Sequence, residues 1–360
     1  MERAKEDRLE KLREQGKNIY SISRLNSLSQ CPYSAYITYV LGNRGDTNVW
    51  AALGSIMHDT LQYIIDEGIS TQALTAGLLT NKLNDGIDNM EISGIDFPKD
   101  RNGGSAIRDN WIANMTGFCD HFKAPTGNFK TEQLVIYKVS DDDYVQGYID
   151  LLKINEDGTV SVYDWKTSSQ FVGDHLIEAG RQLVLYAQAL EQEGYKVNQL
   201  AWVMLKYCVV SWKQKNGKIK EKICEWRNYV AQIRPYLLKP PVAVDIDEFE
   251  LDELVSKAVE NNTLDGLPKE LREQFEIKQY VRYYDYNQEV IDETLNYVTN
   301  QIQSFKDRGK EEKNYPPKNV ASDSYFCSSL CGHNKICPYY KDYCSSFIKT
   351  DKKSEEDDLF

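Results

Sequence analysis

Residues 147–150, Gly-Tyr-Ile-Asp, are followed by residues 162–168, Val-Tyr-Asp-Trp-Lys-Thr-Ser, with the turn Asn-Glu-Asp-Gly at 155–158 between them. An Asp-Gly pair between two alternating apolar runs predicts a β-hairpin. If the turn is centred near Asp157, Asp150 and Asp164 face each other across the strands with Cβ atoms roughly 5 Å apart. Because side chains alternate along a strand, Lys166 shares a face with Asp164 and Trp165 points the other way. The sequence therefore predicts that two acids and one amine converge.

Two ionised carboxylates at that distance repel, so the pair should share a proton or bind a hard divalent cation. We therefore expect a Mg²⁺ or Mn²⁺ site. Lys166 beside it could position or deprotonate a water and offset charge on a phosphate, as phosphodiester hydrolysis requires. The alternative is a surface hairpin with scattered charges. The apolar neighbours of Asp150, Ile149 and Leu151, weaken that alternative.

The hairpin resembles motifs II and III of the PD-(D/E)xK nuclease superfamily, with Gly-x-Ile-Asp and then Asp-Trp-Lys-Thr. Residues 182–186, Gln-Leu-Val-Leu-Tyr, are similar to the Gln-x-x-x-Tyr motif of its RecB-like branch, and residues 54–58, Gly-Ser-Ile-Met-His, resemble the metal-binding histidine segment of that branch. Residues 21–33 resemble the opening of relatives that carry an iron–sulfur cluster, such as the AddB nuclease domain and exonuclease V. The five segments occur in the family's order.

The resemblance implies the roles of the catalytic residues. His58, Asp150, Asp164 and the backbone carbonyl of Trp165 would bind the metal, and Lys166 would be the catalytic lysine.

The resemblance also implies that Gln182 and Tyr186 support the site or the DNA. Residues four apart lie on one face of a helix, which agrees with a shared role. His58, taken without its motif, would be read as a hydrogen-bonded packing residue rather than a ligand. Glu132 resembles an acid that precedes motif II in these enzymes, and its role stays open.

Clustered cysteines supply a second signal. Of eight cysteines, four lie between residues 327 and 344, and Cys31 lies near the N-terminus. Residues 1–17 are charged and lack the apolar core of a signal peptide, and no run of about 18 apolar residues exists to span a membrane. We therefore expect a reducing compartment, where clustered cysteines are metal ligands more often than disulfides. Zinc and a [4Fe–4S] cluster both accept four thiolates, so the spacing leaves both open.

The resemblance favours the [4Fe–4S] cluster, with one N-terminal ligand and three near the C-terminus. We predict Cys31, Cys327, Cys331 and Cys337, which keeps five residues between the last two ligands. The alternative set replaces Cys327 by Cys344. Loss of the cluster should loosen the structure without changing the metal chemistry directly. The remaining cysteines are predicted to be small buried apolar residues: Cys119, Cys208 and Cys224.

The motifs of one active site run from residue 58 to 186, so we predict one composite nuclease domain at 21–349, preceded by a charged helix at 1–20 and followed by a disordered acidic tail at 350–360. Within it we expect a helical cap at about 60–122, a catalytic core at 130–210 and a cysteine region at 320–345. The expected fold is α/β, a PD-(D/E)xK restriction-endonuclease-like core with a mixed central sheet flanked by helices, a helical cap, and an iron–sulfur clasp joining the N- and C-terminal regions. Further elements are predicted from periodicity: a strand at 200–210, an Asn-Gly hairpin at 212–220, and helices at 244–262 and 289–308.

The net charge of −12 and pI near 5.0 argue against broad electrostatic wrapping of nucleic acid. One segment differs: from Lys206 to Arg227, seven basic residues outnumber two acidic ones and alternate with Tyr207, Trp212 and Trp226. Basic residues with aromatics suit single-stranded nucleic acid, whose phosphates need neutralising and whose bases can stack. A charged hairpin edge protected from aggregation by lysines is the equal alternative.

The tail at 353–360, Lys-Ser-Glu-Glu-Asp-Asp-Leu-Phe, is acidic and ends in an apolar pair. It is a solubilising end, or it resembles the acidic tails by which single-stranded-DNA-binding proteins recruit replication or recombination partners.

The sequence as a whole predicts a Mg²⁺- or Mn²⁺-dependent deoxyribonuclease, an exonuclease on single-stranded DNA ends in recombination, repair or replication. We expect no membrane association and a cytoplasmic location, which includes the nucleoid or a phage host's cytoplasm, with a nucleus or organelle left open. The alternatives are a non-catalytic DNA-end-binding module and a zinc-clasped structural subunit.

Overall fold

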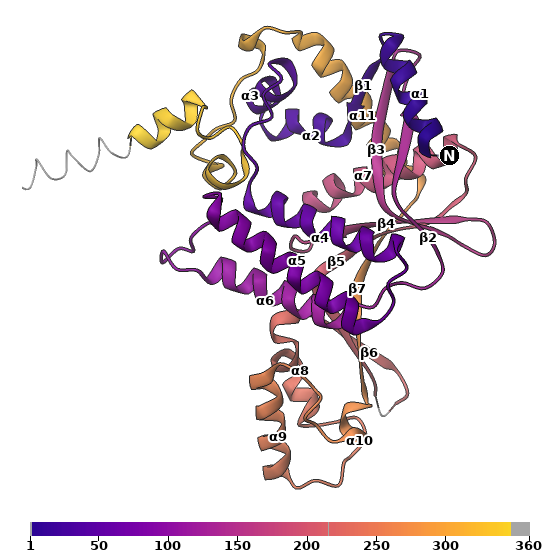
Figure 1. Cartoon of the computed structure of the whole chain (residues 1–360), viewed down its shortest axis with the longest axis vertical. Helices are drawn as coiled ribbons and strands as arrows, with labels where there is room; N and C mark the ends of the chain where they lie inside the picture. The colour runs from indigo at the N-terminus through magenta and orange to yellow at the C-terminus, as the bar shows by residue number, and fades with distance from the viewer. Residues whose placement is uncertain (1, 215, 347–360) are drawn as a thin grey trace, which may run out of the picture.

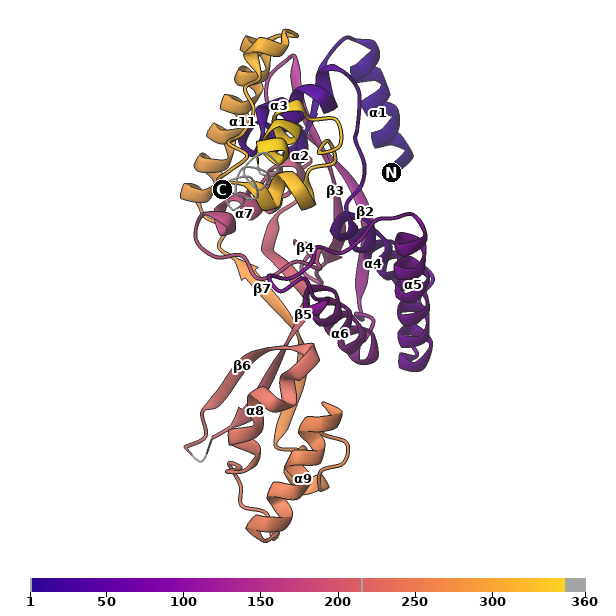
Figure 2. The ribbon, with the colours of Figure 1, turned by 90° about the vertical axis from the view of Figure 1, so that its left-hand side faces the viewer.

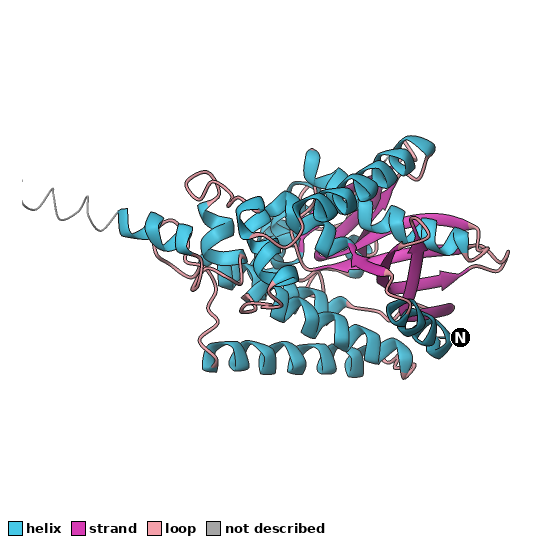
Figure 3. Ribbon diagram, turned by 90° about the horizontal axis from the view of Figure 1, so that it is seen from above, coloured by secondary structure: helices cyan, strands magenta, loops and turns pink. Residues whose placement is uncertain are grey.

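A seven-stranded mixed sheet forms the centre of the protein in a computed structural model that describes residues 2–214 and 216–346, with side chains from Lys5 onward. Its path is β1-β3-β4-β5-β6, with β2 paired to β3 and β7 to β5. The β1–β3 and β4–β5 pairs are parallel and the other pairs are antiparallel. The predicted mixed sheet flanked by helices is confirmed (Figure 3). The strands are β1 (Asn18–Ser21), β2 (Asn128–Lys138), β3 (Asp143–Ile154), β4 (Val160–Lys166), β5 (Val197–Lys213), β6 (Ile219–Glu225) and β7 (Phe275–Tyr284).

Helices cover both faces of this sheet. In Figure 2, α7 and α11 lie on one side of the strands and α4, α5 and α6 on the other. The longer helices are α1 (Glu2–Glu14), α2 (Ile22–Gln30), α4 (Val49–Asp66), α5 (Gln72–Ile92), α6 (Ala106–His121), α7 (Asp174–Gln192), α8 (Tyr229–Leu237), α9 (Glu248–Asn261) and α11 (Gln288–Arg308). The short ones are α3 (Pro32–Ala35), η1 (Tyr36–Val40), η2 (Trp226–Asn228), α10 (Lys269–Arg272), η3 (Glu312–Asn314) and η4 (Phe326–Leu330). No helix in this described part of the chain is both long and apolar enough to cross a membrane.

The sequence of α4 explains how this helix packs against the sheet. Asn48 caps the helix, since its side-chain oxygen accepts a hydrogen bond from Ala51 N at 3.0 Å. Its apolar residues recur at helical spacing, as in Leu53, Met57 and Leu61, and all three are fully buried. Burying this stripe against the sheet holds the adjacent face of α4, which includes His58, beside β3 and β4.

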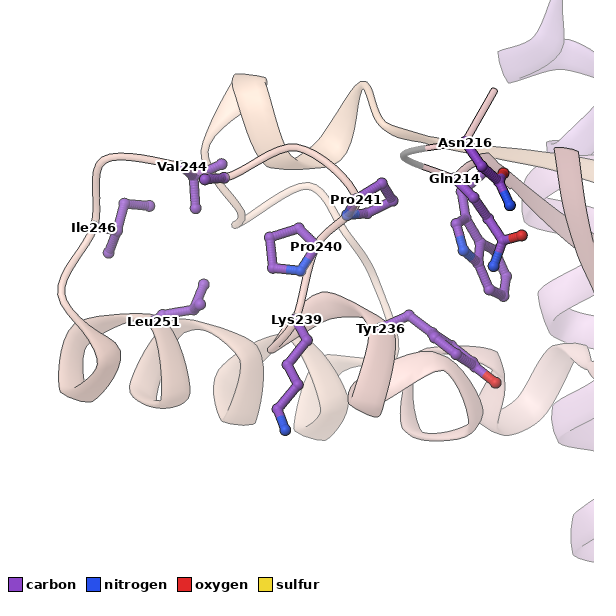
Figure 4. Close-up of a pocket in the computed structure, with 11 residues that line it drawn as sticks. Gln214, Asn216, Tyr236, Lys239, Pro240, Pro241, Val244, Ile246 and Leu251 are labelled. Atoms are coloured by element: carbon purple, nitrogen blue, oxygen red, sulfur yellow. The ribbon is translucent and has the colours of Figure 1, made fainter. Parts of the chain in front are cut away.

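A separate lobe lies beyond the end of the main sheet (bottom of Figure 1). The long strands β5 and β7 run into it and pair there, and β6, α8, α9 and α10 complete it. The predicted Asn-Gly turn joins β5 to β6, with Gly217 at φ +83, a conformation that favours glycine. A hollow in this lobe has mainly apolar walls, and Figure 4 shows residues from the β5–β6 turn, α8, the Pro-Pro segment and α9 around it.

Two segments far apart in the sequence, near residues 45 and 332, pack against each other. Asp46 N donates to Gly332 O at 2.8 Å, and Asn48 Nδ2 donates to Leu330 O at 3.0 Å. The approach requires glycine, because a Cβ at Gly332 would lie 2.3 Å from the backbone oxygen of Asp46. Residues near 45 and near 332 are therefore in direct backbone contact.

Several predicted elements are confirmed, and others were missed. The strand at 200–210 lies within β5, and the helices at 244–262 and 289–308 correspond to α9 and α11. Strands β1 and β7 were not predicted, although apolar residues alternate through most of β7. The division into a terminal helix, composite domain and subregions stays a prediction, and the tail at 350–360 lies outside the described residues.

Candidate active site

The hairpin has the predicted register. β3 and β4 are antiparallel, with Leu152 opposite Val162 and Leu151 opposite Tyr163. The next positions along both strands are Asp150 and Asp164.

A hydrogen bond connects the side chain of Asp150 to the backbone of the strand that carries Asp164. Asp150 Oδ2 accepts a hydrogen bond of 2.8 Å from the backbone N of Trp165, which follows Asp164 in the chain. The strand order thus brings both carboxyl groups to one place.

Both carboxyl groups are almost inaccessible to solvent. Asp150 is 8% exposed and Asp164 1%. Burial, and next the charge of Asp164, raise the pKa of Asp150 to about 8. The Oδ2 atom of Asp164 is buried, and the Lys166 ammonium group lies 2.5 Å from it. Two buried carboxyl groups side by side supply the oxygen donors that a hard divalent cation prefers.

Lys166 lies at these carboxylates. Its Nζ is 2.5 Å from Asp164 Oδ2 and 3.3 Å from Gln182 Oε1, to which it donates. Burial opposes the charge on this amine, but the charges of Asp164 and Asp150 outweigh it and raise the pKa of Lys166. The lysine is therefore held as an ammonium ion inside the site.

Helix α7 supplies the support for that lysine. Gln182 Nε2 donates to Tyr186 OH at 2.8 Å, so Lys166, Gln182 and Tyr186 form one hydrogen-bonded chain. Burial, and then the charge of Asp164, raise the pKa of Tyr186, which keeps its hydroxyl protonated. Gly147 leaves the room for this ring, because a Cβ there would lie 2.3 Å from Tyr186 Cε1. The packing of Tyr186 therefore requires a glycine at this position of the Gly-x-Ile-Asp motif.

His58 reaches the site from α4. Its Nδ1 lies 3.4 Å from Asp150 Oδ2, and its ring is 5.7 Å from that of Trp165. Burial lowers the pKa of His58, although the charge of Asp164 acts in the opposite direction. A neutral imidazole can ligate a metal. The structure thus brings together the histidine, both aspartates and the residue whose carbonyl was predicted as a ligand.

Glu132 occupies an unusual place in β2. The register pairs Thr131 with Leu151 and Gln133 with Ile149, so Glu132 lies level with Asp150, and its φ of +46 is rare for a residue with a side chain. Its charge contributes to the raised pKa of Asp150. Strained backbone of this kind clusters at functional sites. The structure therefore adds a third carboxylate near the site, at the position whose role the sequence left open.

A family comparison accords with this geometry. The model of the PD-(D/E)XK nuclease superfamily matches residues 19–338. The chain belongs to the PD-(D/E)XK nuclease superfamily. Members of this superfamily are nucleases that typically use Mg²⁺ or Mn²⁺. A search of the curated proteins found no match to the chain.

This PD-(D/E)XK chain places the predicted cysteine ligands together. One cavity is lined by four of them: Cys31, Cys327, Cys331 and Cys337. Cys344 is exposed and does not line that cavity.

The pKa of Cys327 also reflects how close these four thiols lie to one another. Burial, and then the neighbouring thiols, Cys331 first, raise the pKa of Cys327 to about 11. In residues 2–214 and 216–346, no three His, Cys, Asp or Glu side chains are arranged to hold one metal ion as they stand. A cluster would therefore need the four thiols to turn toward a common point, and a metal ion in the active site would need the same of His58, Asp150 and Asp164. The three remaining cysteines are buried, as predicted: Cys119, Cys208 and Cys224.

The basic segment from 206 to 227 differs in part from the prediction. Trp212 and Trp226 are 4% and 2% exposed and belong to the hydrophobic core, so the expected stacking of bases on these two rings is wrong. Arg227 pairs with Glu225, and Lys220 lies over the Tyr236 ring. Lys215 lies outside the described residues. The segment thus exposes lysines to solvent, but its two tryptophans are not available for base stacking.

Proposed function

We propose that this PD-(D/E)XK protein is a metal-dependent deoxyribonuclease that degrades single-stranded DNA from its ends. The observation that carries the proposal is the convergence of His58, Asp150, Asp164 and Lys166 at the end of one hairpin, with the lysine held as a cation. These are the residue types that phosphodiester hydrolysis requires.

The proposed roles of the residues accord with their contacts. His58, Asp150, Asp164 and the Trp165 carbonyl would hold Mg²⁺ or Mn²⁺, which supplies a polarised phosphate oxygen and a more acidic bound water. The ammonium group of Lys166 offsets negative charge that develops on the phosphate. Because this charge is fixed before the substrate arrives, little reorganisation is needed during the reaction.

Gln182 and Tyr186 act through Lys166. Gln182 accepts from the lysine and donates to Tyr186, so the amine is held in one orientation. Asp150 accepts the Trp165 amide, which fixes the peptide whose carbonyl is the fourth proposed ligand.

The proposed structural cofactor is a [4Fe–4S] cluster held by Cys31, Cys327, Cys331 and Cys337. Its support is that these four thiols line one cavity and come from both ends of the described chain. The cluster would reinforce the contact between the segments near 45 and 332.

The remaining proposals are a role in recombination, repair or replication, a cytoplasmic location, and a protein partner for the acidic tail.

Cleavage of defined substrates tests the proposed activity. Anaerobically purified protein with Mn²⁺ or Mg²⁺ should shorten linear single-stranded DNA progressively, and should spare circular single-stranded DNA and RNA. Cutting of the circle would make the enzyme an endonuclease instead. Binding of linear DNA with no cleavage under any metal would favour the non-catalytic end-binding module.

A further inference from the structure

A lysine next to the active site has no assigned role. Lys206 lies on β5, the strand parallel to β4, and the register places Lys166 beside Met204. Lys206 is two residues further along the chain. It therefore lies just beyond the level of the catalytic lysine, on the side where β4 ends.

The backbone of β5 is irregular where this lysine stands. The ladder with β7 shifts register between Val203 and Cys208, and residues 204–207 pair with no residue of β7. The side chain of Gln279 fills the gap, since its Nε2 donates to Met204 O at 2.8 Å and to Tyr207 O at 3.1 Å. Bulges of this kind redirect side chains and are frequent beside active sites.

The bulge aims Lys206 at the loop that leaves the active site. Its Nζ donates to Ser169 Oγ at 3.3 Å, and Ser169 follows Lys166 by three residues. Lys206 is half-buried and forms no ion pair in the described part of the chain. Glu225, whose charge acts on Lys206, is already paired with Arg227. Burial lowers the pKa of Lys206, as expected for a cation that has lost water without gaining a carboxylate.

We propose that Lys206 and Ser169 form a phosphate-binding subsite that holds the DNA phosphate next to the scissile one. The inference rests on the proposed nuclease function for its ligand, a DNA backbone. A partly desolvated ammonium with a hydroxyl beside it is a suitable receptor for a phosphate oxygen. An exposed lysine lacks these features: Lys196, directly before β5, is exposed and lies beside Val160 at the start of β4, the opposite end of that strand from Lys166.

Salt dependence of binding tests the subsite without requiring catalysis. The affinity for a labelled single-stranded oligonucleotide is measured in EDTA over a range of salt concentrations for wild type, Lys206→Gln, Lys206→Arg, Ser169→Ala and Lys196→Gln. Loss of one phosphate contact should lower the slope of log K against log salt by about 0.7. We expect this lower slope in Lys206→Gln, a partly retained slope in Lys206→Arg, weaker binding in Ser169→Ala, and a wild-type slope in Lys196→Gln.

Kinetics give a second readout. Because a neighbouring phosphate is bound equally in the ground and transition states, Lys206→Gln should raise KM about 3- to 30-fold and change kcat less than about 2-fold. The proposal is overturned if Lys206→Gln and Lys206→Arg both bind with the wild-type slope, or if Lys196→Gln lowers the slope equally. If wild type cleaves no DNA while the Lys206 slope still falls, the nuclease function fails and the subsite stands.

Discussion

The ammonium group of Lys166 and the side-chain amide of Gln182 are joined by a hydrogen bond of 3.3 Å between a strand and a helix that are adjacent in the chain. The bond makes the orientation of the lysine depend on α7. Gln182 is itself held by Tyr186 at 2.8 Å. The position of the charged amine therefore depends on how α7 packs against the sheet.

Replacing Gln182 by Met should leave Lys166 without this acceptor. We expect kcat on single-stranded DNA to fall about 10- to 100-fold, as for other residues that orient a group at a metal site. The KM should change little, because Gln182 lies behind the lysine. Gln188→Met is the matched control, since Gln188 lies on the same helix but bonds Tyr286. Equal kcat values in the two variants would contradict the role of Gln182.

Gly147→Ala should disturb the same support by a steric route. The added Cβ would lie 2.3 Å from Tyr186 Cε1, so the ring must move or β3 must shift. Overpacking of this kind costs about 1–3 kcal/mol of unfolding free energy. We therefore expect a lower melting temperature together with reduced kcat. Gly77→Ala is the control, because Gly77 lies in α5 with nothing within 4 Å, and it should be neutral or stabilising. Equal stability of both variants would contradict the packing reason for Gly147.

Asp143→Asn should destabilise the protein in a pH-dependent way. Asp143 accepts hydrogen bonds from Lys306 at 2.7 Å, Ser140 at 2.8 Å and Asn18 at 3.0 Å, tying β3 to α11 and β1. Burial alone would raise its pKa, but these partners, Lys306 first, hold the pKa below its usual 3.8. A depressed pKa stabilises the folded state above 3.8, and this contribution is lost as the pH falls through the lower folded value.

We therefore expect Asp143→Asn to unfold about 1.5–3 kcal/mol more easily in urea at pH 7. The difference from wild type should shrink only below pH 3.8. Asp141→Asn is the control, because Asp141 is exposed and pairs with a surface lysine. A difference that disappears already between pH 7 and pH 5 would contradict the assignment.

The proposed cluster predicts a specific pattern of cysteine variants. Anaerobically purified wild type should contain about four irons and four sulfides per chain. Cys31→Ser and Cys327→Ser should lose them and unfold at lower temperature, whereas Cys344→Ser should keep them, because Cys344 is exposed outside the cavity. Loss in Cys344→Ser with retention in Cys327→Ser would establish the alternative ligand set. Zinc without sulfide in wild type would contradict the cluster.

The sequence could predict the hairpin and its partners because their signals are local. The Asp-Gly turn determines the register that places Asp150 beside Asp164, and the four-residue spacing places Gln182 above Tyr186. The family resemblance supplied His58, which no local rule brings to Asp150. These features depend on turn geometry and strand alternation, which are readable along the chain.

Other features depend on contacts between distant segments. The bulge that redirects Lys206 exists because Gln279 of β7 satisfies the carbonyl groups of β5, and nothing near residue 206 indicates this. The positive φ of Glu132 likewise occurs where the register of β2 with β3 skips one residue, between Thr131 and Gln133. For Trp212 and Trp226, which stand among lysines, the sequence left base stacking and a charged hairpin edge equally open. Packing on α8 and α6 buries both rings.

The most direct test of the account is cleavage of linear single-stranded DNA by wild type, Asp164→Asn and the surface control Asp307→Asn, with Mn²⁺ and without divalent metal. We predict that wild type and Asp307→Asn cleave only with metal. Asp164→Asn should be slower by about 1,000-fold or more, which corresponds to several kcal/mol of transition-state stabilisation. Cleavage by Asp164→Asn at the wild-type rate, or wild-type cleavage that needs no metal, would contradict the proposed active site.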